Sequence, residues 1–157
     1  MTNYRQMLVA IDLSEETDQV LARARDEAQR HGATLSLVPV MKPFIHVYGG
    51  FGGIGPGDYG GRLASLEVEL QNDARQRVAA IAAANSIPPA RTHVLLGNPA
   101  AEIRALCAGD NGAEGKADLL VIGTHGRHGL GLLLGSTANA VLHGIDIDVL
   151  VVRIRFD

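Results

Sequence analysis

The chain has 157 residues, the length of one ordinary domain with enough material to bury a core. Hydrophobic residues make up 46% and charged residues 20%, values typical of soluble globular proteins, so the composition excludes a chain that is disordered throughout. The formal net charge is −3, and without a basic surplus or a polybasic run the sequence predicts no nucleic-acid partner and no attachment to an anionic membrane.

Five short segments are apolar at nearly every position, and each is an expected strand. Continuous runs of this kind, as opposed to alternating ones, are typical of strands buried on both faces of a parallel sheet. In chain order they are Met7–Ile11, Leu35–Val40, Thr92–Leu96, Leu119–Ile122 and Ile147–Ile154.

Helical patterns separate these strands. Ser14 can cap a first helix that Gly32 ends, and Asn98 followed by Pro99 is a cap and a first-turn proline that open a third. Ser136 can cap a fourth. The second helix is expected from about residue 62 to 85, because its apolar residues fall three or four apart and form one face. These are Leu63, Leu66, Leu70, Ala74, Val78 and Ile81.

The alternation of strands and helices predicts an α/β fold. We expect a single doubly wound, Rossmann-like domain over residues 1–157, with four helices around a five-stranded parallel sheet in the order 3-2-1-4-5. In such a fold ligands bind at the carboxyl ends of the strands, where the winding reverses. Two stretches are interpreted as connections: a glycine-rich flexible loop at about 42–61, which could also close over the strand ends, and a polar loop at 109–116.

The stretch 123–137, GTHGRHGLGLLLGST, is the best candidate for chemistry, because it follows a buried strand and precedes a helix. Glycines permit close backbone approach to a ligand, and amides at a helix start attract anions. Ser136 and Thr137 add hydroxyl donors, and Arg127 adds a fixed positive charge. Together these features predict a phosphate or other anion site. The alternative is a plain turn in which Ser136 is only a helix cap.

Several other classes of site are excluded by missing motifs. The chain has no GxxxxGK[ST], no GxGxxG after the first strand and no GxSxG, so it is not expected to be a P-loop ATPase, a dinucleotide-dependent Rossmann enzyme or a serine hydrolase of the elbow type. The single cysteine, Cys107, suits a reducing compartment. With no signal peptide and no run of roughly 20 apolar residues, the expected location is cytoplasmic.

Several motifs resemble the universal stress protein family, and the similarity covers nearly the whole chain. They are the opening strand with Asp12, the segment Gly97-Asn98-Pro99, the block DLLVIGTHGRHGLGLLLGSTANAVL and the closing strand DVLVVR. The loop and the Ser-Thr-Ala-Asn run are most similar to proteobacterial A-type members. The resemblance implies an adenine nucleotide alpha hydrolase-like fold, a role in stress survival, no established catalysis, and a homodimer built through the last strand.

The resemblance also implies ATP or AMP binding in some branches of the family, with Mg²⁺ if the ligand is a triphosphate. No metal is expected otherwise. Carried over by position, Asp12 would contact the ribose or a metal, and Ala10 or Ile11 would line the adenine pocket with Val40. The phosphates would be held by Gly123, Thr124, Gly126, Gly135, Ser136 and Thr137, with Arg127 nearby.

One departure from the nucleotide-binding pattern bears on the ligand. Those branches carry G-x2-G-x9-G-[ST], whereas only eight residues separate Gly126 from Gly135 here. A loop one residue shorter favours a monophosphate or simple anion over a full triphosphate.

Three functional hypotheses follow from the sequence. The first is a non-catalytic stress-response module that binds an adenine nucleotide or phosphate-type anion. The second is a nucleotide-free dimeric interaction protein of the A type with an unidentified protein partner. The third is a slow ATP hydrolase, for which Asp12, His125 and His128 are the candidate bases.

Overall fold

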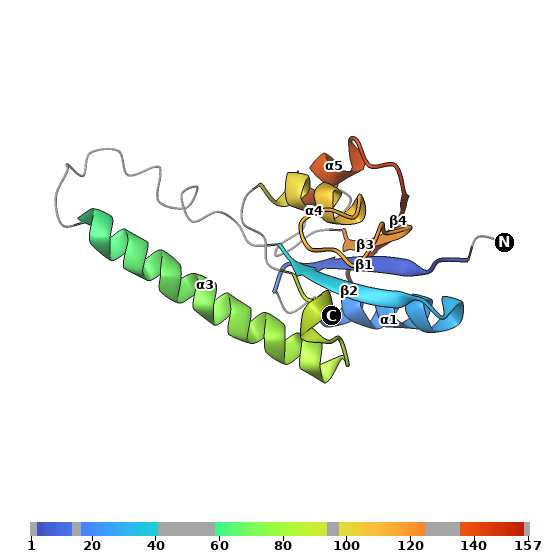
Figure 1. Cartoon of the computed structure of the whole chain (residues 1–157), viewed down its shortest axis with the longest axis horizontal. Helices are drawn as coiled ribbons and strands as arrows, with labels where there is room; N and C mark the ends of the chain where they lie inside the picture. Colours follow the sequence, from blue (N-terminus) through green and yellow to red (C-terminus); the bar gives the residue numbers. More distant parts are fainter. Residues whose placement is uncertain (1–2, 14–16, 41–58, 94–97, 125–135, 156–157) are drawn as a thin grey trace.

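The computed structural model describes residues 3–13, 17–40, 59–93, 98–124 and 136–155. Within them, four parallel strands form one sheet in the order β2-β1-β3-β4 (Figure 1). The strands are β1 (Gln6–Ile11), β2 (Thr34–Pro39), β3 (Leu119–Gly123) and β4 (Asp148–Val152).

Helices cover both faces of this sheet. They are α1 (Thr17–His31), α3 (Tyr59–Ala84), α4 (Pro99–Cys107) and α5 (Ser136–Leu142), with a short 3-10 turn, η1 (Pro89–Arg91), after α3. In Figure 1, α1 and the end of α3 lie on one side of the sheet, and α4 and α5 on the other. The predicted class, a parallel α/β fold, is therefore confirmed, and the described residues contain four α-helices.

Alternation along β1 produces the two halves of the core. Met7, Val9 and Ile11 pack with α1, β2 and the last turns of α3. Leu8 and Ala10 point the other way and pack against α4 and α5. Because successive side chains of a strand face opposite sides, a strand covered on both faces must be apolar throughout, as the run MLVAI is.

The prediction of five strands in the order 3-2-1-4-5 is wrong for the described residues. The third expected strand contributes only Thr92, which forms an isolated parallel bridge to Leu37 beside β2. The residues just before it form the turn η1, in which the amides of Arg91 and Thr92 donate to the carbonyls of Pro88 and Pro89 at 2.9 and 3.1 Å. The rest of that run, 94–97, lies outside the described residues.

The apolar face expected on the second helix is only half buried. Ala74 and Val78 lie in the core at 8% and 2% exposure, whereas Leu66 and Leu70 are 38% and 47% exposed. The first half of α3 extends beyond the sheet (Figure 1), so Leu66 and Leu70 have no sheet beneath them. The helix also begins at Tyr59, inside the stretch expected to be a loop, most of which lies outside the described residues.

Two of the predicted helix ends agree with the structure, whereas Ser136, predicted as a cap, is the first residue within α5. Asn98 precedes α4, and its side-chain oxygen accepts a hydrogen bond from the Ala101 amide at 3.1 Å. Gly32 follows α1 with φ of +63°, a left-handed conformation that favours glycine. Among the described residues, none of the helices combines the length and the hydrophobicity that a membrane span requires.

Candidate functional site

The strand ladders define a candidate site at the carboxyl edge of the sheet. β1 pairs with β2 as far as Ile11↔Pro39, and β3 pairs with β4 as far as Gly123↔Val152. Between these two pairs, β1 and β3 stay in register only as far as Val9↔Val121. The central ladder therefore ends two residues before its neighbours.

This early end coincides with a change in winding. The chain passes from β1 outward to β2 on one side, and from β3 outward to β4 on the other. The point between β1 and β3 is thus the topological switch point, where open α/β sheets bind their ligands. The end of β1 and the end of β3, both predicted to carry site residues, lie on either side of it.

The structure separates two residues that the sequence left as alternatives for the adenine pocket. Ala10 is 7% exposed and belongs to the core layer beneath α4 and α5, and Val40 packs against the same layer. Ile11 is 2% exposed and faces α1 in the other layer. The Val40 amide donates to the Ile11 carbonyl at 2.6 Å, which fixes the chain just beyond β2. Only Ala10 therefore shares a face with Val40.

Asp12 lies at the exposed end of β1. The next residue, Leu13, has φ of +61°, a left-handed conformation that costs a residue with a side chain about 1 kcal/mol. Its carbonyl accepts a hydrogen bond from Arg77 Nη2 of α3 at 2.9 Å. Sequence reasoning missed Arg77, because an arginine on a helix is normally assigned to the solvated face and only the tertiary fold brings it to this turn.

Thr124 connects the site to the end of the chain. Its amide donates to the Val152 carbonyl at 2.9 Å, and its Oγ1 accepts a hydrogen bond from the Ile154 amide at 3.2 Å. The hydroxyl proton can still be donated to a ligand. Thr124 thus has a structural role that the sequence did not reveal, and its predicted contact with phosphate stays a prediction.

Packing around Gly123 leaves little room for a side chain. A Cβ atom at this position would lie 3.0 Å from Val20 Cγ2 and 3.3 Å from Ile154 Cδ1. The space is therefore filled by the protein itself on the α1 side. The predicted contact of the Gly123 backbone with phosphate is a separate matter and stays a prediction.

Most of that loop is not placed by the structure. Gly126, Arg127 and Gly135 lie outside the described residues, so their predicted contacts stay predictions. The backbones of Ser136 and Thr137 form the first turn of α5. Amide groups in a first turn have no carbonyl partner within the helix, as the predicted anion site requires.

Other chemistry finds no support in the described part of the chain. No group of three or more histidine, cysteine or acidic side chains is arranged there to hold a metal ion. Cys107 is 3% exposed, and burial raises the pKa of its thiol to about 11, so little thiolate forms near neutral pH. It acts as a small core residue of α4.

Comparison with known proteins gives a consistent result. The model of the universal stress protein family matches residues 3–153. Universal stress protein A homologs 1 and 2 of Coxiella burnetii are both 36% identical to the chain, over 98% and 99% of its length and 99% of theirs.

Solved structures share the fold at lower identity. A universal stress protein from Archaeoglobus fulgidus in complex with dAMP has a TM-score of 0.59 and 20% identity, covering 96% of this chain and 99% of that one. A universal stress protein in complex with cAMP has a TM-score of 0.54 and 24% identity, covering 96% and 98%.

Proposed function

Because the chain belongs to the universal stress protein family, we propose that it is a non-catalytic, cytoplasmic stress-response module that binds an adenine nucleotide at the carboxyl edge between β1 and β3. The observation that carries this proposal is the early end of the β1–β3 ladder at Val9↔Val121. Adenine would lie against Ala10 and Val40, and the ribose would face Asp12.

A nucleoside monophosphate is the favoured ligand. The 123–137 loop is one residue shorter than the family's nucleotide-binding pattern. We expect the missing residue to displace loop amides that would otherwise donate hydrogen bonds to a terminal phosphate. Two of the solved structures with this fold are complexes with dAMP and cAMP, each with a single phosphate. Both considerations support AMP ahead of ATP.

Calorimetric titration with AMP, ATP and inorganic phosphate tests the proposal. We expect AMP to bind more tightly than ATP, and phosphate alone to bind at least tenfold more weakly than AMP, because it lacks the adenine contact. Heat from neither nucleotide at millimolar concentration, together with no nucleotide in the protein purified from cells, would refute nucleotide binding.

Two aspartates provide a matched pair of variants. Asp12→Asn removes the carboxylate at the end of β1, and we expect about tenfold weaker AMP binding, the size of one lost charge-assisted hydrogen bond. Asp73→Asn changes an exposed aspartate of α3 and should leave the affinity unchanged. Equal affinities of the two variants would show that the nucleotide does not contact Asp12.

A second candidate function, a nucleotide-free dimeric interaction protein, is favoured by the edge of the sheet. β4 is the outer strand of the described sheet, and Val151 on it is 36% exposed. An apolar edge strand presents unpaired backbone groups that another chain can pair with. We therefore include a homodimer through the last strand in the proposal, whether or not nucleotide is bound.

A further inference from the structure

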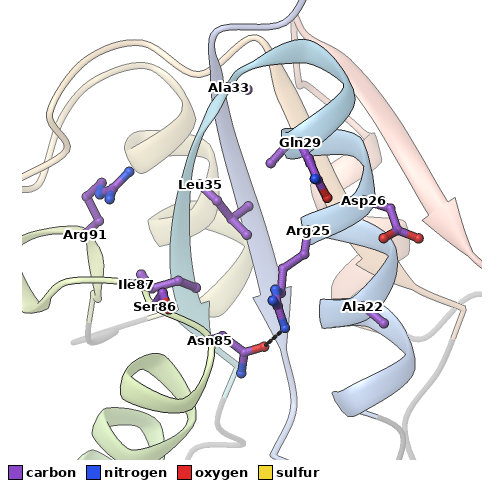
Figure 2. A pocket seen from close by; sticks show the side chains of 11 residues that line it. Ala22, Arg25, Asp26, Gln29, Ala33, Leu35, Asn85, Ser86, Ile87 and Arg91 are labelled. Carbon is purple, nitrogen blue, oxygen red and sulfur yellow. Dashed lines mark hydrogen bonds between the residues drawn. The ribbon is translucent and has the colours of Figure 1, made fainter.

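A groove of about 470 Å³ lies on the α1 side of the molecule, at the beginning of β2. Its walls come from the second half of α1, from Ala33 and Leu35, and from the segment 85–91 that follows α3 (Figure 2). Since the proposed nucleotide site is at the opposite, carboxyl end of the same strands, the groove is a separate feature. Its volume is in the range of small-molecule sites.

The floor of the groove is apolar. Ala28, Leu35 and Ile87 are 8%, 7% and 5% exposed and belong to the core layer on this side of the sheet. Figure 2 shows Leu35 on β2, with Ile87 below it on the segment that follows α3. Only a small part of these side chains is exposed, so they offer a ligand a narrow apolar strip between polar walls, which an aliphatic group can cover.

The rim supplies a cation that is already oriented. Arg25 Nη1 donates to Asn85 Oδ1 at 3.3 Å, and the Asn85 amide nitrogen in turn donates to the Ile81 carbonyl at 2.8 Å. Asn85 is therefore fixed to the end of α3 and holds the Arg25 side chain across to it (Figure 2). A guanidinium has five N–H donors in a planar fork, so this bond leaves others to pair with an anion.

The overall charge of the lining selects the kind of anion. Arg91 lies on the other side of Leu35 and Ile87 from Arg25, and Asp26 points away from Arg25 (Figure 2). Two arginines and one aspartate give the lining a formal charge of +1. A single positive charge beside an apolar floor suits a monoanion with an apolar group better than a phosphate dianion.

We propose that this groove binds a free carboxylic acid with a short aliphatic chain. The carboxylate would pair with Arg25, with Arg91 adding positive charge from the far side, and the chain would lie over Leu35 and Ile87. Nothing in the proposal depends on nucleotide binding.

An NMR titration of the isotope-labelled full chain with hexanoate tests this site. We expect the backbone amides of Ala33, Ser86 and Ile87 to shift. Hexan-1-ol has the chain without the charge, and acetate has the charge without the chain. Each should bind at least tenfold more weakly than hexanoate.

Two arginines of the same helix make the test specific. Arg25→Gln should weaken hexanoate binding about tenfold and leave AMP binding unchanged, whereas Arg23→Gln, which changes an arginine paired with Glu27 outside the groove, should have no effect on either ligand. The proposal is overturned if hexan-1-ol binds as tightly as hexanoate, if Arg25→Gln binds like the unmodified protein, or if tens of millimolar hexanoate shift none of these amides.

Discussion

At Gly123 the space that a side chain would occupy already contains Val20 and Ile154. Gly123→Ala should therefore lower the free energy of unfolding by about 1–3 kcal/mol in the absence of any ligand, the usual cost of overpacking a core. Urea denaturation measures this. Adding Val20→Ala removes the closest atom, so the double variant should lose less than the sum of the two single changes.

Gly115→Ala is the control for this experiment. An added Cβ at that position meets nothing within 4 Å, so the free energy of unfolding should stay nearly constant. If Gly123→Ala were equally neutral, the contact of β3 with α1 would be looser than the structure has it, and the glycine would have to be explained by ligand approach.

His93 should make stability depend on pH. Burial lowers the pKa of this half-buried histidine below its ordinary 6.5, and the charge of Glu114 opposes the shift only in part. The unfolded chain then binds the proton more tightly than the folded one. Stability should be complete above pH 6.5 and should fall as the pH drops through that value toward the folded pKa.

Comparing the unmodified protein with His93→Gln isolates this contribution. Unfolding free energies measured from about pH 8 to about pH 5 should fall less in the variant, because glutamine does not titrate. An identical decrease in both proteins would assign the acid sensitivity to other groups.

At the scale of elements, the ends of α1 and α3 are built alike but use different residues. Gly32 follows α1 with φ of +63°, and Ser86 follows α3 with φ of +59°. In both, the amide of the next residue donates back across the last turn, Ala33 to Ala28 and Ile87 to Ala82, each at 2.8 Å. This is the helix ending that glycine favours, so Ser86 carries strain that Gly32 avoids.

One substitution at each helix end measures that strain. Ser86→Gly should raise the free energy of unfolding by about 1 kcal/mol, and Gly32→Ala should lower it by a similar amount, since no atom lies within 4 Å of the added Cβ and only backbone conformation changes. Thermal and urea denaturation report both. Changes of the same sign in the two variants would be inconsistent with a shared ending.

The elements also show where a sequence pattern ceases to determine structure. Asn98 and Pro99 predicted the start of α4 correctly, because a cap depends only on neighbouring residues. The spacing of Leu66 and Leu70 predicted a helix face equally well, yet both are exposed. Periodicity identifies the apolar face of a helix, but whether a sheet lies beneath it depends on how far the helix extends past the rest of the fold.

At the scale of the whole molecule, the position of β4 leads to a prediction about assembly. Val151→Lys places a charge on the outer strand, and we expect the proposed dimer to dissociate at least tenfold more readily, because charged side chains on an edge strand oppose pairing with another chain. Sedimentation velocity over a range of protein concentrations measures this. Unchanged sedimentation of a dimer would place the interface elsewhere.

A substitution at a neighbouring exposed residue is the control for the sedimentation experiment. Arg153→Gln lies just beyond the same strand, at an exposed position, and removes a charge without disturbing the apolar edge. It should sediment like the unmodified protein. Both variants should keep the stability of the monomer, because neither position belongs to the core.

The architecture could be predicted further than the site. Continuous apolar runs identified all four described strands, and their alternation with helices implied parallel pairing with ligands at the carboxyl edge. The choice of Ala10 over Ile11 for the face of Val40 required the layers on each side of the sheet. The bond from Ile154 to Thr124 joins residues thirty positions apart, which no local pattern encodes.

The hydrogen bond from Arg77 to the Leu13 carbonyl joins the turn after β1 to a helix of 26 residues. Some eighteen residues of α3 lie before Arg77, a length of roughly 27 Å at the rise of an α-helix. A rotation of about 5° at this attachment would carry the start of the helix through roughly 2 Å. A small movement of the turn beside Asp12 would thus produce a larger displacement at the start of α3.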